Sequence, residues 1–246
     1  MRTNYHTHTH RCNHAVGSDE SYVQSAIFGG YDLLGFADHT PWPFTDGYVS
    51  PIRMRLDQVD GYVASIRRLA EEYKDQIEIT VGLECEYYPD YIPWLKEQKE
   101  RLALDYLLLG NHYPYTEPNP LYFAKVTTRE QLKLYLESSI KAMETKLFDC
   151  FAHPELFMRS YPTTDDYCKG VFGEIATAAK ELGVTLELNT SMPTFHTQLW
   201  EIVAQVGCKV IIGMDAHDRK LLKSEVLYSQ AEENLRSVGI TPIYKL

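Results

Sequence analysis

The chain has 246 residues, and its 34 Asp and Glu outnumber its 24 Lys and Arg, so the formal net charge is -10 and tight, sequence-independent binding to nucleic acid is disfavoured. Hydrophobic residues make up 44% and charged residues 24%, which is ordinary for a globular protein, and no apolar run approaches the roughly 18 residues needed to cross a bilayer. We therefore expect one domain, residues 1–246, that binds neither nucleic acid nor a membrane.

The N-terminal segment and the cysteines indicate the compartment. Residues 1–6 lack the apolar stretch of a signal peptide and lead directly into a polar, histidine-rich motif. The five cysteines are dispersed along the chain and contain no C-x-x-C pair, so neither a disulfide framework nor a zinc ribbon is indicated. We expect reduced thiols and a cytoplasmic protein.

Seven short apolar runs alternate with longer segments of helical periodicity, the pattern of a parallel α/β sheet with crossover helices. The predicted strands are Asn4 to Thr9, Leu33 to His39, Ile77 to Glu86, Tyr106 to His112, Asp149 to His153, Thr185 to Ser191 and Lys209 to His217. No glycine-rich or serine-rich linker interrupts the series. The order of strands and helices therefore predicts an α/β fold of repeated strand–helix units.

The segments between these runs divide into a long loop and amphipathic helices. The proline-containing stretch from Thr40 to Arg55 predicts a loop that could cover a site. Apolar residues at spacings of three and four predict helices over 59–73 and 132–147, the second preceded by a capping-box sequence that begins at Thr128. A further helix over 165–182 is followed by a glycine, as expected at a helix C-terminus.

Imidazole and carboxylate side chains stand at the carboxyl ends of the predicted strands, where α/β barrels place their active sites. They are His6, His8, His39, Glu84, His112, His153, Asp215 and His217, with His14 in the loop after the first strand. Residues two apart on a strand point to one side, so His6 with His8, and Asp215 with His217, would face one cavity. Bringing so many polar and charged side chains together in a buried site costs free energy unless cations bind between them. Nine ligands are more than a single ion can bind. We expect two or three divalent ions, with Zn, Fe and Mn all acceptable to these ligands.

Other residues near the strand ends admit two interpretations. His10 is expected to point to solvent, and Cys12 and Cys85 to be small buried side chains. Glu86 and Glu155 could orient imidazoles or could be exposed surface carboxylates. A role at the site and an ordinary structural role both stay open for Arg53, Arg55, Asn189, Ser191 and the aromatic group Tyr87, Tyr88, Tyr91 and Trp94.

Short motifs along the whole chain resemble those of the polymerase-and-histidinol-phosphatase (PHP) superfamily. They are His6-Thr7-His8, Ala37-Asp38-His39, Gly82-Leu83-Glu84, Gly110-Asn111-His112, Ala152-His153-Pro154 and Asp215-Ala216-His217. The flanking sequences Cys12-Asn13-His14, Asp38-His39-Thr40-Pro41, Met54-Arg55 and Gly82-Leu83-Glu84-Cys85-Glu86-Tyr87 resemble the histidinol-phosphate phosphatase branch. The resemblance implies a distorted seven-stranded (β/α)7 barrel, similar to a TIM barrel, and a trinuclear metal centre.

The resemblance also implies how the ligands divide among the metals. The first metal would be held by His6, His8, Glu84 and Asp215, the second by a bridging Glu84 with His112 and His153, and the third by His14, His39 and His217. The implied reaction is metal-assisted hydrolysis of L-histidinol phosphate to L-histidinol and phosphate, a step of histidine biosynthesis. No protein nucleophile is required.

Two further residues are expected to contact the substrate. Arg159 matches the position of a phosphate-binding arginine in this branch, and its planar guanidinium suits that task. His196, in the loop after the sixth predicted strand, is a candidate substrate-binding residue. The group that protonates the leaving alcohol is left open among His196, Asp38 and metal-bound water.

Two other functions stay open from the sequence alone. A PHP enzyme could act on another phosphate ester, such as a nucleotide, and a PHP module could bind metal without catalysis. The oligomeric state is unknown.

Overall fold

The computed structural model describes residues 1–119 and 121–246, and its centre is a single sheet of seven parallel strands in the order β1-β2-β3-β4-β5-β6-β7. The strands are β1 (Thr3–Asn4), β2 (Leu33–His39), β3 (Glu78–Cys85), β4 (Tyr106–Leu109), β5 (Cys150–Phe151), β6 (Thr185–Asn189) and β7 (Val210–Gly213). Each strand pairs with the next in the chain, as crossover helices of one hand require.

The sheet closes between its first and last strands. Thr7 forms an isolated parallel bridge with Ala216, the His8 N–H donates to the Ala216 carbonyl, and the Ala216 N–H donates to the His6 carbonyl, both at 3.1 Å. These contacts lie beyond the regular parts of β1 and β7. The predicted seven-stranded (β/α) barrel is therefore confirmed.

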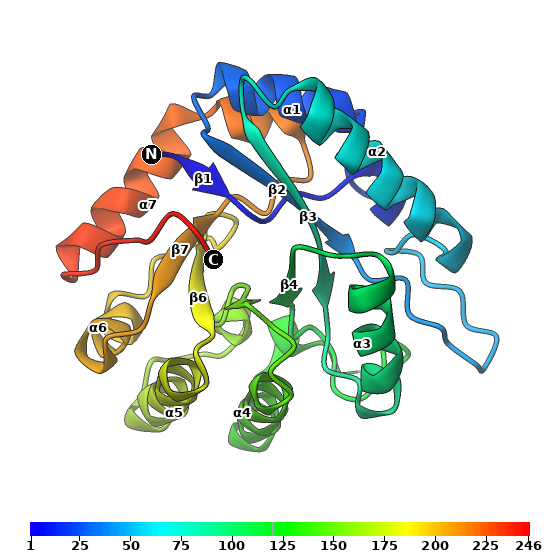
Figure 1. Cartoon of the computed structure of the whole chain (residues 1–246). Coiled ribbons are helices and arrows are strands. Elements are labelled where there is room, and N and C mark those ends of the chain that lie inside the picture. The colour runs from blue at the N-terminus through cyan, green and yellow to red at the C-terminus, as the bar shows by residue number, and fades with distance from the viewer. Residues whose placement is uncertain (120) are drawn as a thin grey trace.

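In the part of the chain that the structure describes, seven helices surround the strands on the outside of the barrel (Figure 1). They are α1 (Asp19–Phe28), α2 (Val59–Glu72), α3 (Ile92–Arg101), α4 (Arg129–Glu144), α5 (Asp166–Leu182), α6 (Thr197–Val206) and α7 (Glu225–Ser237). Short 3-10 helices lie in the connections: η1 (His10–Cys12), η2 (Leu56–Gln58), η3 (Pro89–Tyr91), η4 (Phe123–Lys125), η5 (Leu156–Arg159) and η6 (Arg219–Lys223). Among the described helices, none combines the length and the hydrophobicity that crossing a membrane requires.

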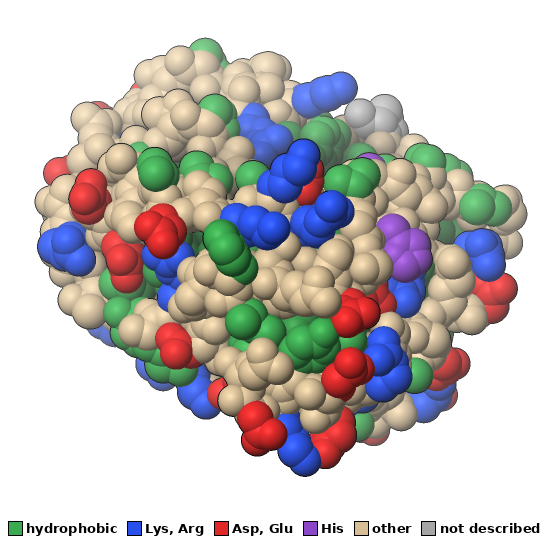
Figure 2. Space-filling view, turned by 90° about the horizontal axis from the view of Figure 1, so that it is seen from above, with side chains coloured by type: hydrophobic (Ala, Val, Ile, Leu, Met, Phe, Trp, Pro, Cys, Tyr) green, Lys and Arg blue, Asp and Glu red, His purple; other side chains and the backbone are tan. Residues whose placement is uncertain are grey.

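The helix predictions are confirmed with small shifts at the ends. Thr128 and Gln131 form the predicted capping box of α4, and Gly183 ends α5 with a φ of 76°. The predicted loop from Thr40 to Arg55 contains no helix or strand. Figure 2 shows the face over α1 and α2, where acidic and basic side chains both occur, as expected for the polar sides of amphipathic helices.

Two hydrophobic layers stabilise the barrel. Strand side chains that point outward pack against the helices, and this layer forms the larger part of the core. A smaller cluster fills the inside of the barrel with side chains such as Tyr5, Tyr106 and Ile211. Ile243 packs against this inner cluster, and its N–H donates to the Val210 carbonyl at 2.8 Å. The chain end thus closes the amino-terminal side of the barrel, which leaves the carboxyl ends of the strands for the site.

The prediction of a strand from Asn4 to Thr9 is wrong, because β1 ends at Asn4. The Asn4 side chain accepts from the His6 N–H at 3.2 Å and donates to Thr7 Oγ1 at 2.7 Å, so it replaces regular sheet hydrogen bonds with a local turn. The predicted strands before His112, His153 and Asp215 also end earlier than expected. These side chains therefore lie on the loops that follow the strands.

Candidate metal centre

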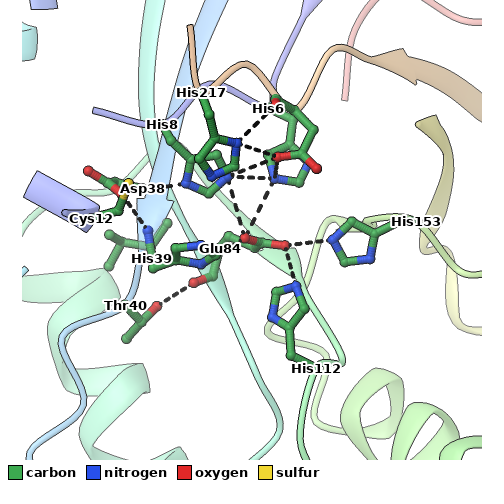
Figure 3. Close-up of polar contacts among 12 residues, drawn as sticks. His6, His8, Cys12, Asp38, His39, Thr40, Glu84, His112, His153 and His217 are labelled. Carbon is green, nitrogen blue, oxygen red and sulfur yellow. Dashed lines mark hydrogen bonds and ion pairs between the residues drawn. The ribbon is translucent and has the colours of Figure 1, made fainter. Parts of the chain in front are cut away.

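Five of the predicted ligands converge on the carboxylate of Glu84, which lies at the centre of the site (Figure 3), each with a ring nitrogen 2.9 to 3.6 Å from one of its oxygens: His6, His8, His39, His112 and His153. Glu84 belongs to β3 and His39 ends β2, while the others follow a strand: His6, His8 and His14 after β1, His112 after β4, His153 after β5, and Asp215 and His217 after β7. His14 lies at the exposed edge, with its ring centroid 4.6 Å from that of His217. The structure thus brings all nine predicted ligands to one end of the barrel.

Four ligand atoms surround one point deep in this site. His6 Nε2 and His8 Nε2 are 3.1 Å apart, and Asp215 Oδ1 lies 3.5 Å from the first and 3.3 Å from the second. Glu84 Oε2 is 3.6 Å from each of the two nitrogens. Four ligands about 2.1 Å from one tetrahedral ion are separated by ~3.4 Å. These four side chains therefore fit one divalent metal.

The other oxygen of Glu84 faces a second group of ligands. Glu84 Oε1 is 2.9 Å from His153 Nε2 and 3.5 Å from His112 Nε2. One carboxylate therefore faces two groups of imidazoles with its two oxygens. Glu84 could therefore hold two cations, one at each of its oxygens.

A third group lies toward the cavity entrance. His8, His39 and His217 offer nitrogen atoms within 4.8 Å of one another, and so do His14 and His217 together with the Cys12 sulfur. The Nδ1 atom of His14 donates to the Cys12 carbonyl at 2.7 Å, which leaves Nε2 free to bind. His14, His39 and His217 thus offer ligands for a further ion, with the buried Cys12 beside them and His8 shared with the first group.

Buried polar atoms without hydrogen-bond partners provide an independent test of whether metals fit here. Glu84 Oε2, His39 Nδ1 and His217 Nε2 are buried and lack a hydrogen bond. His39 Nδ1 lies 3.0 Å from Glu84 Oε2, but the two atoms are not aligned as donor and acceptor. Unpaired polar atoms of this kind are costly in a protein interior. The donor set therefore fits divalent cations bound by nitrogen and oxygen.

The charges of the site favour cations as well. Burial alone would raise the pKa of Glu84, but the imidazoles of His112 and His6 outweigh burial and hold this pKa well below its usual range. Burial acts to lower the pKa of His6, yet carboxylates, that of Glu187 foremost, raise it well above the ordinary value. Burial lowers the pKa of His39 to about 3. Ionised carboxylates thus attract positive charge into a site that includes a neutral imidazole.

Glu187 on β6, which the sequence analysis did not single out, holds two of these ligands. Its fully buried carboxylate accepts from His6 Nδ1 at 2.9 Å, so the Nε2 lone pair of His6 points toward Glu84. It also accepts from the backbone N–H of His153 at 3.0 Å and from Asn189 Nδ2 at 2.9 Å. His153 has a φ of 36°, a strained conformation that this contact stabilises. A charged residue inside an apolar strand was the available sequence signal.

Two glycines make room for the central carboxylates. A Cβ atom on Gly110 would lie 2.3 Å from Glu84 Oε1, and one on Gly213 would lie 1.7 Å from Glu187 Oε1. Any side chain at either position would displace a carboxylate. The glycines of β7 and of the β4 end therefore permit the close approach on which the site depends.

The two carboxylates whose role was left open differ in the structure. Glu86 is fully buried and accepts from His112 Nδ1 at 2.8 Å, so it orients an imidazole. Glu155 is also buried, but it accepts from Trp200 Nε1 at 3.1 Å, and burial raises its pKa to about 8. In the described part of the chain Glu155 makes no hydrogen bond to an imidazole.

Asp38, one of the candidate proton donors, is anchored away from the cavity. It is fully buried and accepts from the Thr9 hydroxyl and, at 2.8 Å, from the N–H of His39. Its Oδ1 lies 3.5 Å from His8 Nδ1. These contacts place Asp38 where it can hold the neighbouring predicted ligands His8 and His39 in position.

Several other open interpretations are resolved as structural. His10 is exposed, as expected, and the exposed Arg55 pairs with Asp57 at 3.0 Å. The Tyr88 ring packs 5.1 Å from that of Trp42, within an aromatic group that also contacts Tyr91 and Trp94. These aromatic residues do not belong to the described lining of the site. Arg53, in contrast, is buried among carboxylates.

A cavity of about 410 Å³ opens onto the ligands. Its described lining is His14, His39, Ile52, Glu84, His112, Tyr113, Tyr122, His153, Leu156, Arg159, Ser191, Asp215 and His217. Arg159 at the end of η5 reaches Ser191, whose hydroxyl accepts from Nη2 at 3.3 Å and donates to Asp215 Oδ2 at 3.0 Å. The predicted phosphate-binding arginine thus lies beside the ligands. His196 precedes α6 and does not belong to the described residues that line this cavity.

Comparison with known proteins identifies the family. The sequence profile of the PHP domain matches residues 4–191. The chain belongs to the PHP domain family. A probable histidinol-phosphatase of Schizosaccharomyces pombe is 33% identical over 274 residues, which cover 99% of this chain and 89% of that protein. A probable histidinol-phosphatase of Deinococcus radiodurans is 27% identical over 248 residues, 95% of this chain and 92% of that protein.

A solved structure supports the same barrel. Histidinol phosphate phosphatase from Lactococcus lactis, in a complex with Zn, L-histidinol and phosphate, superimposes with a TM-score of 0.79 at 21% identity and covers 98% of this chain and 95% of that one. The match to the PHP domain profile ends at residue 191, whereas Asp215 and His217 follow β7. Two of the nine predicted ligands therefore follow the last strand of the barrel, beyond the matched profile.

Proposed function

We propose that this PHP-domain protein is a metal-dependent phosphomonoesterase that hydrolyses L-histidinol phosphate to L-histidinol and phosphate. The observation that carries the proposal is the convergence of nine imidazole and carboxylate side chains at one end of the barrel, seven of which line the same cavity as Arg159. The names of the relatives that span nearly the whole chain support the substrate. We place the enzyme in the cytoplasm and treat residues 1–246 as one domain that acts on a small ester, not on nucleic acid.

The proposal assigns two or three divalent ions, Zn, Fe or Mn, to the three groups of ligands. The nine residues are His6, His8, His14, His39, Glu84, His112, His153, Asp215 and His217. Such ions stabilise negative charge on phosphoryl oxygens and activate water for attack on phosphorus. The protein itself fixes the ligand orientations, through Glu187 for His6 and through Glu86 for His112.

Arg159 is proposed to bind the phosphate. Its side chain is exposed at the cavity rim, and its contact with Ser191 places the guanidinium beside Asp215. A planar guanidinium donates two parallel hydrogen bonds to phosphoryl oxygens and adds positive charge where negative charge develops. Arg159 thus orients the ester with its phosphorus toward the ligands.

The organic half of the ester would lie against the less polar wall of the cavity. Ile52, Tyr113, Tyr122 and Leu156 form this wall, and the rings of Tyr113 and Tyr122 stack with centroids 5.1 Å apart. A flat imidazole ring suits an aromatic surface of this kind. His196 remains a predicted substrate contact, and we assign the proton donor to neither His196 nor Asp38.

A panel of phosphate esters tests the substrate directly. Metal-loaded enzyme should be offered histidinol phosphate, several nucleoside monophosphates and phenyl phosphate, with kcat/KM from phosphate release as the readout. We expect histidinol phosphate to be preferred by more than about 100-fold, which corresponds to roughly 2.7 kcal/mol of transition-state stabilisation. A flat profile, or a preference for a nucleotide, would overturn the substrate. Phosphate release that persists after complete chelation would overturn the metal dependence.

A further inference from the structure

A buried arginine in the loop after β2 joins two buried carboxylates from distant parts of the chain. Arg53 is 2% exposed, its Nη2 donates to Glu86 Oε1 at 2.6 Å, and its Nε donates to Glu117 Oε2. Glu86 follows β3, and Glu117 lies in the connection between β4 and α4. Burying a guanidinium is costly unless it is paired and hydrogen-bonded. The loop from Thr40 to Arg55 therefore depends on both carboxylates for its position.

The Glu86 side of this junction leads to a proposed metal ligand. Glu86 Oε1 accepts from both Arg53 Nη2 and His112 Nδ1, and its Oε2 accepts from Trp42 Nε1 at 2.8 Å. With Nδ1 donating, His112 directs the Nε2 lone pair toward Glu84 Oε1, 3.5 Å away. Arg53 thus holds the Glu86 carboxylate in place, and Glu86 in turn holds the His112 imidazole in its orientation.

The Glu117 side leads to the wall of the cavity. Glu117 Oε1 accepts from the Tyr48 hydroxyl at 2.8 Å and from the Ser50 hydroxyl at 2.6 Å, so three residues of the loop bind one carboxylate. Ile52, which lines the cavity, immediately precedes Arg53. The connection that carries Glu117 also carries the wall residues Tyr113 and Tyr122. The contact therefore draws the two halves of the wall together.

We propose that Arg53 is a positioning residue that couples the orientation of His112 to closure of the wall that receives the organic half of the substrate. The substrate half of this inference rests on the proposed function, whereas the ligand half requires only that metal binds. The two sides act through different carboxylates, so they are separable. Glu86 governs metal retention, and Glu117 governs the fit of the organic group.

Three variants and one control test the coupling. Arg53→Lys keeps the charge but loses the planar geometry that reaches both carboxylates, while Glu86→Gln and Glu117→Gln each weaken one side. Arg55→Lys is the matched control, because Arg55 lies two residues away, exposed, and pairs only with Asp57 among the described carboxylates. The measurements are metal content after a fixed chelator challenge, limited proteolysis of the loop 40–55, and KM and kcat for histidinol phosphate and for methyl phosphate, which is too small to reach the wall.

The Glu86 contact and the Glu117 contact of Arg53 predict different experimental results. Glu86→Gln should weaken metal retention by about tenfold, in the range found for residues that orient metal ligands. Glu117→Gln should raise KM for histidinol phosphate about tenfold, leave the KM for methyl phosphate and the metal content unchanged, and speed cleavage of the loop. Arg53→Lys should do both.

Two outcomes would overturn the inference. Arg53→Lys could match Arg55→Lys in metal retention and loop cleavage, or it could lower only the melting temperature, as a purely structural residue would. If the wild-type enzyme showed no preference for histidinol phosphate, the proposed function would fail instead. Metal retention and loop cleavage need no substrate, so they would still test Arg53.

Discussion

Replacing Glu187 with glutamine should loosen the metal centre without changing any ligand. The buried carboxylate accepts from His6 Nδ1, from the His153 N–H and from Asn189 Nδ2, so all of its described partners are donors. A glutamine of the same shape must direct its own NH2 group at one of these donors. If the amide nitrogen faces His6, that ring must accept at Nδ1 and carry its proton on Nε2, which removes the lone pair from the metal side. If the amide nitrogen faces the His153 N–H instead, two donors point at each other and that hydrogen bond is lost.

The expected magnitude follows from the contacts that are lost. A hydrogen bond to a charged group contributes about 1.5–3 kcal/mol. At 1.4 kcal/mol per factor of ten, this corresponds to a loss of roughly 10- to 100-fold in metal affinity, the range found when residues that orient metal ligands are changed. Because the ligand atoms stay in place, we expect weaker binding, not abolished binding.

Elemental analysis of protein dialysed against graded chelator concentrations measures this loss. The control is Glu78→Gln, which removes a carboxylate from the exposed start of β3, where Glu78 pairs with Lys245 at the surface. We expect the control to match wild type and Glu187→Gln to release metal at about tenfold lower chelator concentration. Equal retention in all three proteins would refute the role assigned to Glu187.

Three further predictions concern the substrate clamp, the space around the ligands and the ligands themselves. Arg159→Ala should raise KM about tenfold and weaken inhibition by inorganic phosphate, with the melting temperature unchanged because the side chain is exposed; unchanged kinetics would contradict the clamp. Gly110→Ala should lose metal because its Cβ would lie 2.3 Å from a site carboxylate, whereas Gly170→Ala, with open space in α5, should retain it and gain about 0.5–1 kcal/mol of stability. His153→Ala should lose phosphate release and metal together, while the exposed His10→Ala should keep both; equal behaviour would show that His153 is no ligand.

The barrel and the convergence of the nine candidate ligands were predictable because both follow from repeated local patterns. Strand and helix periods alternate seven times, and parallel strands place their carboxyl ends together, so residues as distant as His6 and His217 could be assigned to one site. The convergence of these side chains could be predicted without knowing the exact residue at which each strand ends. Asp215 lies past the end of β7, yet its Oδ1 still lies 3.5 Å from His6 Nε2 and 3.3 Å from His8 Nε2.

Apart from Glu86, for which the sequence already suggested a role in orienting an imidazole, the supporting contacts were not predictable, because they depend on pairs of residues that no local pattern links. Glu187 and His6 are 181 residues apart, and the sequence shows only a charged residue in an apolar strand. Arg53 binds Glu117 across 64 residues and two irregular loops. Likewise, His196 lies just before α6, and its position depends on the conformation of the loop after β6. The number of residues between His196 and the sixth strand does not reveal that conformation.

The most direct test of the metal centre is anomalous diffraction from crystals of metal-loaded protein, collected at the absorption edge of the bound metal. We expect two or three peaks within bonding distance of the nine ligands, with Glu84 between two of them. A single peak elsewhere, or none after soaking with Zn, Fe or Mn, would contradict this expectation.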